Sequence, residues 1–124
     1  MKRPLLGELE QKIMLVLWES KTPLKPIQVK EKLRSQYAYT TVMTVLKRLT
    51  DKNLLKRKLK NKAYFYSPKR DKKLFVENRL GSFFDEVINN FGNLAISQFV
   101  DSVKKNQENL KLLKKYLKKN VQKF

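Results

Sequence analysis

The sequence predicts a mainly α-helical chain with one small β-hairpin, arranged as a winged helix-turn-helix followed by further C-terminal helices. Three observations predict this fold class. Apolar residues recur at helical spacing in three segments before residue 53, two short strand-like runs follow, and helical spacing returns after Pro68. With only three Gly and four Pro in 124 residues, the chain has little room for long loops.

The first two helices are predicted from spacing and from their end signals. Apolar residues of the first helix form one face and predict a helix over residues 8–19 with Gly7 as N-cap: Leu9, Ile13, Val16 and Leu17. Trp18 near its end is expected in the core. Pro26 then suits the first turn of a short helix that ends near residue 35.

The third helix is predicted over residues 40–52, where four apolar residues make one stripe: Val42, Val45, Leu46 and Leu49. Its opposite face carries hydroxyl and charged side chains: Thr41, Thr44, Lys47, Arg48 and Asp51. Asn53 follows as a left-handed C-cap. One buried stripe and one polar face are typical of a helix that packs on a core and presents side chains to a partner.

Two strands with a polar turn complete the winged helix. Residues 54–59 and 63–68 are rich in Leu, Tyr and Phe, and residues 60–62 between them are polar. Tyr64 and Tyr66 alternate with Phe65, so one side of this strand is expected to pack on the third helix.

The C-terminal region predicts three more helices. Asp71 is a suitable N-cap for the first, Gly92 ends it, and further helices cover residues 94–103 and the chain from residue 106. Their apolar faces exceed what these helices bury among themselves, which predicts a homodimer. The residues expected at the dimer interface are Leu80, Phe83, Phe84, Val87, Phe91, Phe99, Leu110, Leu113 and Leu117.

The charge of the chain predicts a polyanionic partner. The net charge is +18, and residues 1–70 hold 18 Lys and Arg against 5 acids. This strong positive field belongs to the part that resembles a winged helix, so double-stranded DNA is the expected partner. We therefore expect residues 1–70 to form a winged-helix DNA-binding domain and residues 71–124 a helical dimerisation domain.

Composition argues against catalysis and against a metal site. The chain has no Cys and no His, which removes the commonest thiolate and imidazole ligands and the commonest general base. We find no nucleophile–base pair and no Gly-rich phosphate loop, so no cofactor and no enzymatic activity are expected. No apolar run spans a membrane and no signal-peptide core follows the N-terminus, so the expected location is the cytoplasm.

The third helix and the wing hold the candidate DNA-contacting residues. The small hydroxyl side chains of Thr40, Thr41 and Thr44 let a helix approach base edges closely, with Met43 on the flank. Lys47 and Arg48 lie further along the helix, where phosphate contact is expected. The wing adds five cations within seven residues: Lys56, Arg57, Lys58, Lys60 and Lys62.

Three segments of the sequence resemble a known family. LGELEQKIMLVLW, AYTTVMTVLKRLTDKNLLKRK and KAYFYSP are similar, in order and spacing, to the penicillinase and methicillin-resistance repressors, a family that includes copper-transport repressors. The resemblance implies a homodimeric winged-helix repressor of a palindromic operator, with β-lactam resistance or a related stress response as the process under its control. It also adds Tyr39 to the DNA-contacting residues.

Two features of the family bear on regulation. Its copper-responsive branch binds metal through cysteine clusters, and this chain has no cysteine, which excludes copper sensing by that device. In its β-lactam branch, a sensor protease cleaves the dimerisation domain at an Asn-Phe bond. The corresponding position here is Gln98-Phe99, so this bond is a candidate cleavage site and a sensor protease a candidate partner.

Three other functions compete with that of a sequence-specific repressor. A nonspecific architectural DNA-binding protein fits the charge alone, but it has no need for the threonine face of the third helix. A module that binds an acidic protein or a membrane surface ranks third, and an enzyme last. Comparing the binding of an operator with that of a scrambled duplex separates the specific repressor from the architectural protein.

Overall fold

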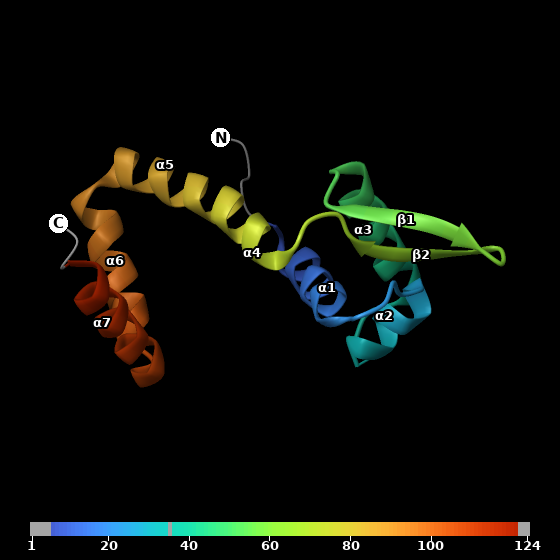
Figure 1. Cartoon of the computed structure of the whole chain (residues 1–124), viewed down its shortest axis with the longest axis horizontal. Coiled ribbons are helices and arrows are strands. Elements are labelled where there is room, and N and C mark those ends of the chain that lie inside the picture. The colour runs from blue at the N-terminus through green and yellow to red at the C-terminus, as the bar shows by residue number, and fades with distance from the viewer. Residues whose placement is uncertain (1–5, 35, 122–124) are drawn as a thin grey trace. The chain divides into compact units, whose positions relative to one another are not determined.

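The computed structural model describes residues 6–34 and 36–121, and it is mainly α-helical with one β-hairpin, as the sequence predicts (Figure 1). The chain divides into two compact units between Gly81 and Ser82. The first unit contains α1 (Glu8–Glu19), α2 (Pro26–Lys32), α3 (Tyr39–Asp51), β1 (Leu55–Lys60), β2 (Ala63–Pro68), α4 (Lys72–Phe75) and the π-helical segment η1 (Val76–Leu80). The second is built from α5 (Gly81–Phe91), α6 (Asn93–Lys104) and α7 (Gln107–Val121).

Helix α1 begins after Gly7, as predicted, and supplies one wall of the core. The Glu10 carboxylate accepts a hydrogen bond from the Gly7 backbone N–H at 3.2 Å, which satisfies a donor that the helix start leaves unpaired. Ile13, Met14 and Leu17 are buried. Leu9 and Val16, which the sequence places on the same face, are only partly buried, and Met14 fills the core beside Ile13 instead.

The core of the first unit forms where α2 and α3 pack against α1. Pro26 opens α2, and Val29 from its middle is fully buried. The predicted stripe of α3 is confirmed, because all four of its apolar residues are buried: Val42, Val45, Leu46 and Leu49. Asn53 has φ 64°, the left-handed conformation expected of the residue that ends this helix.

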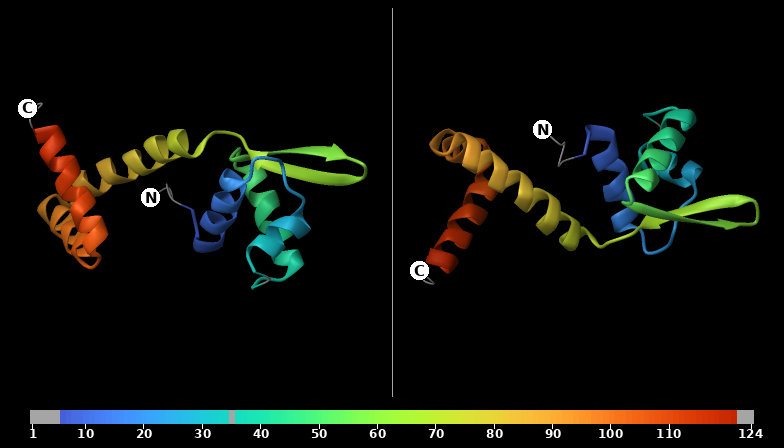
Figure 2. Two further views of the ribbon diagram at one scale, coloured as in Figure 1. Left: turned by 60° about the horizontal axis from the view of Figure 1, so that its bottom comes forward. Right: turned by 90° about the horizontal axis from the view of Figure 1, so that it is seen from above.

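The hairpin is antiparallel and closes through two residues, Asn61 and Lys62. Both have positive φ, 51° and 64°, as a two-residue turn requires when its twist matches the strands. Tyr66 in β2 is 2% exposed and exchanges two backbone hydrogen bonds with Leu24, at 2.8 and 2.9 Å. This bridge fixes the base of the hairpin to the helices, while its turn extends away from them in both views of Figure 2.

The helix that follows the wing begins as expected and continues differently. The Asp71 side chain accepts a hydrogen bond from the Leu74 N–H at 2.7 Å and so caps α4. The sequence predicts a regular helix from there to Gly92, but Val76–Leu80 is π-helical. Gly92, with φ 50°, ends α5 as predicted. Because α4 and η1 fall in the first compact unit, they belong structurally with the winged helix, and the functional domain limits stay a prediction.

The second unit leaves much of its apolar surface uncovered. The Asn106 side chain caps α7 by accepting from the backbone N–H groups of Glu108 and Asn109, at 2.9 and 3.1 Å. Phe84 of α5 meets Phe99 of α6 edge to face, with ring centroids 6.2 Å apart. Within the described part of this unit, however, no side chain is classed as buried.

No helix among the described residues is long and apolar enough to cross a membrane.

A partly buried ion pair joins α1 to the residue that follows α3. Lys52 Nζ lies 2.8 Å from Glu10 Oε2, and Glu10 is only 8% exposed. Burial raises the pKa of the Glu10 carboxyl, but the hydrogen bonds from Lys52 and the Gly7 backbone, with the charges of Lys52 and Arg48, outweigh it and lower the pKa below its ordinary value. The charged pair therefore stabilises the fold above the pKa of an unfolded glutamate, about 4.3.

We expect Glu10→Gln to lower the free energy of unfolding by about 1 to 2 kcal/mol at pH 7, since half-exposed Lys52 limits the gain from pairing. Because the folded pKa is lowered, the stabilisation is fully present above the unfolded value of about 4.3 and is lost as pH falls through the folded pKa, so the difference between variant and parent should shrink steadily at acidic pH. Urea unfolding across this range measures the difference. Glu8→Gln is the matched control, since Glu8 is 84% exposed in its pair with Lys12. An equal loss for both variants would contradict a special role for Glu10.

Candidate nucleic-acid interface

The residues of α3 that are predicted from the sequence to contact DNA all lie on its exposed face. The stripe of valines and leucines turns inward, so the remaining positions turn out to solvent. The predicted residues on α3 are all exposed: Tyr39, Thr40, Thr41, Met43, Thr44, Lys47 and Arg48. The first turn of α3 carries no acidic residue, so the positive end of the helix dipole is not neutralised there.

The threonines differ in what they offer to a base. Thr44 Oγ1 donates to the Thr40 carbonyl at 2.9 Å, one helical turn earlier. Its hydroxyl proton is therefore engaged, and Thr44 presents acceptor lone pairs and a methyl group. A thymine methyl or a base amino group is a suitable partner for those two features.

The base of this face is an open groove between the start of α1 and α3. Gly7 and Glu10 line it from α1, and Thr41, Thr44 and Arg48 line it from α3. Arg48 lies close enough to Glu10 for its charge to help lower the pKa of that carboxyl. The buried carboxylate thus attracts Arg48 toward the edge of the exposed face.

Four of the five predicted wing cations are divided between the two faces of β1, and the fifth lies in the turn. Side chains alternate along a strand, so Lys56, Lys58 and Lys60 share one face of β1 and Arg57 takes the other. All three lysines are exposed, as is Lys62 in the turn. The predicted cluster is therefore a lysine row with a separate arginine.

Arg57 is held by two tyrosines of the neighbouring strand. Its guanidinium carbon lies 4.1 Å from the ring centroid of Tyr64, and it hydrogen-bonds the side chain of Tyr66. That hydrogen bond, and the nearby phenols, raise the pKa of Arg57 above its ordinary value. The positioning role of the tyrosines was missed in the sequence. The pairing of two strands with Arg57 opposite Tyr66 is the signal that identifies it.

The residues predicted for dimerisation lie on all three helices of the second unit, with one exception. Leu80 belongs to η1 and lines an apolar hollow of the first unit with Leu6, Leu15 and Phe75. Phe84, Phe91, Phe99 and Leu117 are 40%, 61%, 47% and 53% exposed. The others are partly buried: Phe83, Val87, Leu110 and Leu113.

The candidate cleavage site lies inside a helix. Gln98 and Phe99 are in the middle of α6 and both are exposed. A protease that reads an extended segment would need this helix to unwind locally.

Comparison with known proteins shows which family the chain matches. The family model described as penicillinase repressor matches residues 6–119. Two curated relatives from strains of Mycobacterium tuberculosis, each named transcriptional regulator BlaI, are 46% identical over 65 residues, which is 51% of this chain and 47% of theirs. The match thus spans about half the length of these relatives.

Solved structures agree in fold alone. A mutant of ZitR from Lactococcus lactis has a TM-score of 0.50 at 19% identity, over 85% of this chain and 77% of that one. A transcriptional regulator from Thermotoga maritima has a TM-score of 0.48 at 23% identity, over 92% and 77%.

The family match covers nearly all of the sequence, including both the winged helix and the helices that follow it. The chain belongs to the penicillinase repressor family, whose members are transcriptional repressors and not enzymes.

Proposed function

We propose that the protein is a homodimeric repressor that occupies a palindromic DNA operator. The observation that carries the proposal is the exposed face of α3, where three threonines at the helix start precede Lys47 and Arg48. A recognition helix reads bases with its N-terminal residues, and small side chains there permit close approach to the major groove. The cations behind them suit phosphate contact.

The wing supports this proposal through its shape and charge. The hairpin extends beyond the helices, and its lysine row and turn carry Lys56, Lys58, Lys60 and Lys62. Such a surface suits the sugar-phosphate backbone beside the groove that the recognition helix enters. Arg57 occupies the other face, already oriented by Tyr64, so less conformational entropy is lost when it binds.

The apolar helices of the second unit support a homodimer. Phe91, Leu94 and Tyr116 are 61%, 69% and 59% exposed, and solvent contact of so many large apolar side chains is unfavourable. A second copy of the chain offers the same surface in return, as two-fold interfaces require. Two winged helices then reach half-sites about 34 Å apart, one turn of DNA.

The runner-up is a nonspecific architectural DNA-binding protein. The net charge of +18 favours it, since counterion release alone gives strong binding at low salt. A purely electrostatic binder gains nothing from an exposed row of Thr40, Thr41 and Thr44, and this row favours the repressor.

The regulated process and the inducing signal extend the same proposal. Family membership supports a role in controlling a gene for β-lactam resistance or a related stress response, with the protein acting in the cytoplasm. Inactivation through a sensor protease at Gln98-Phe99 would require local unwinding of α6. A variant that cannot be cleaved there, Phe99→Ala, should keep repressing in cells exposed to the inducer, provided that it still dimerises.

A footprint tests the function most directly. The full chain is bound to the DNA upstream of its own gene at about 150 mM salt with excess random duplex. A protected site with two-fold symmetry supports a dimeric repressor. Uniform protection that the competitor abolishes would instead support the architectural protein.

We expect Thr44→Ala to cost about 1 to 3 kcal/mol of discrimination at one base pair, measured by titrating operator and scrambled duplexes. Thr50→Ala is the matched control. Both hydroxyls donate to the carbonyl four residues earlier, at 2.9 and 2.8 Å, but Thr50 lies at the far end of α3. Equal losses on both duplexes would overturn the assignment of Thr44.

Arg57→Ala should weaken operator and scrambled duplexes by the same factor, because phosphate contacts carry no sequence information. Tyr64→Leu should produce part of the same loss, since it removes the ring that orients Arg57. Binding isotherms at two salt concentrations measure both effects. A loss confined to the operator would instead identify Arg57 as a base-reading residue.

Leu117→Asp should raise the dimer dissociation constant at least tenfold, because the substitution places a charge on a surface that the dimer buries. Leu117 is 53% exposed in the single chain, so the substitution should leave the fold of each protomer intact. Sedimentation equilibrium measures the constant, and neighbouring Lys118→Asp on the same helix is the control. An unchanged constant would remove Leu117 from the interface.

A further inference from the structure

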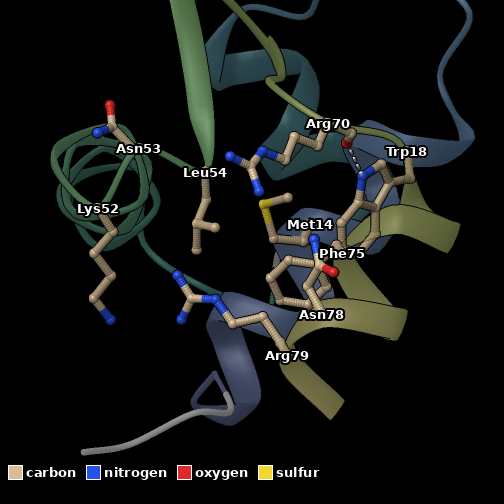
Figure 3. Close-up of a pocket in the computed structure, with 9 residues that line it drawn as sticks. All are labelled: Met14, Trp18, Lys52, Asn53, Leu54, Arg70, Phe75, Asn78 and Arg79. Atoms are coloured by element: carbon tan, nitrogen blue, oxygen red, sulfur yellow. Dashed lines mark hydrogen bonds between the residues drawn. The ribbon is translucent and has the colours of Figure 1, made fainter. Parts of the chain in front are cut away.

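A small cavity of about 130 Å³ lies in the first unit, away from the exposed face of α3. It is partly open to solvent and is lined by α1, by the residues that follow α3, by Arg70 after β2, and by α4 with η1 (Figure 3). Met14, Trp18, Leu54 and Phe75 supply its apolar lining. Neither the family comparison nor the DNA-binding face accounts for this cavity.

The aromatic wall of the cavity is held in place. The rings of Trp18 and Phe75 are tilted by 50° with centroids 5.1 Å apart. Trp18 Nε1 donates to the Arg70 carbonyl at 3.0 Å, so the same hydrogen bond orients the indole and fixes the backbone from which the Arg70 side chain extends. The wall is therefore formed before any ligand arrives.

Two arginines give the cavity a positive charge that the surrounding structure leaves unpaired. The guanidinium groups of Arg70 and Arg79 both turn toward the space beside Leu54 (Figure 3). No acidic side chain lines the cavity, and over residues 6–34 and 36–121 neither arginine forms an ion pair. Lys52 differs, since it pairs with Glu10 and its ammonium group turns away.

The π-helical segment η1 contributes one of these arginines. It brings Asn78 and Arg79 to the lining, and the Arg79 guanidinium lies 5.9 Å from the ring centroid of Phe75. Single π-helical turns inside α-helices are rare and occur frequently at functional sites. This local departure from the regular helix lies at the same place as the charged cavity.

We propose that this cavity binds a small aromatic carboxylate. Guanidinium groups match the planar geometry of a carboxylate and bind it through paired hydrogen bonds. The volume is close to that of a cavity of about 150 Å³ that accepts benzene, so one ring fits against Trp18 and Phe75. The site takes its charge from Arg70 and Arg79 and its shape from the aromatic wall. It does not depend on the proposed operator.

Trp18 is the only tryptophan of the chain, so its fluorescence reports on the cavity directly. The full-length protein is titrated with benzoate at constant ionic strength. A saturable change in emission is expected. Benzamide, which keeps the ring without the charge, and acetate, which keeps the charge without the ring, should each bind at least tenfold more weakly. A purely linear response to benzoate, or an equal response to benzamide, would overturn the proposal.

Two variants assign the binding to the arginines. Arg70→Gln and Arg79→Gln should each raise the benzoate dissociation constant at least tenfold, whereas Arg34→Gln, which removes the same charge outside the cavity, should leave it unchanged. Arg70 is exposed, and its hydrogen bond with Trp18 uses the backbone carbonyl, so Arg70→Gln should keep the fold. This variant therefore tests the site even if the partly buried Arg79 is needed for folding. Circular dichroism checks the fold. An unchanged benzoate dissociation constant in the folded Arg70→Gln variant would contradict binding of the carboxylate at this site.

Discussion

Burial of one stripe on α3 is the constraint from which the rest of the winged helix follows. Val42, Leu46 and Leu49 are fully buried, and a fully buried aliphatic side chain contributes about 1.5 to 3 kcal/mol relative to an exposed one. The cost of burying the charged and hydroxyl side chains of the opposite face acts in the same direction. The rotation of α3 about its own axis is thereby fixed, and with it the set of side chains that a partner can meet.

Polar interactions then adjust what hydrophobic packing has placed. Glu10 joins the start of α1 to the residue after α3 and attracts Arg48 from the same side. In the wing, Tyr66 anchors the hairpin through Leu24 while its hydroxyl holds Arg57. In both places one residue belongs to the core and also orients a cation on the surface. Packing and presentation of charge are therefore coupled, and a change in either residue affects both.

Periodicity in the sequence is sufficient to predict the helices, the stripe of α3 and the hairpin, because apolar spacing reflects burial directly. Residues whose placement depends on tertiary contacts were not predicted. Glu10 is polar and lies on the face of α1 that packs near Lys52, which a single-helix pattern does not reveal. The π-helical turn at Val76–Leu80 adds no periodic signal strong enough to separate it from a regular helix.

The candidate site also has a part that the sequence predicts and a part that it does not. The exposed residues of α3 could be listed from the sequence, since whatever a buried stripe excludes must face outward. The grouping of wing cations could not, because Arg57 and Lys58 are neighbours in sequence and point to opposite faces once β1 pairs with β2. The cavity beside Trp18 is also invisible in the sequence, as its lining comes from segments far apart along the chain.

The two-residue turn at Asn61 and Lys62 limits how this wing can vary among related sequences. Both residues occupy the left-handed region, where β-branched side chains are strongly disfavoured, and the lysine remains there although glycine would adopt the conformation with less strain. Insertions are restricted as well. An added residue that shifted the pairing by one position would move every lysine of β1 to the face that now carries Arg57. Substitutions along the strands are therefore better tolerated than changes in the length of the turn.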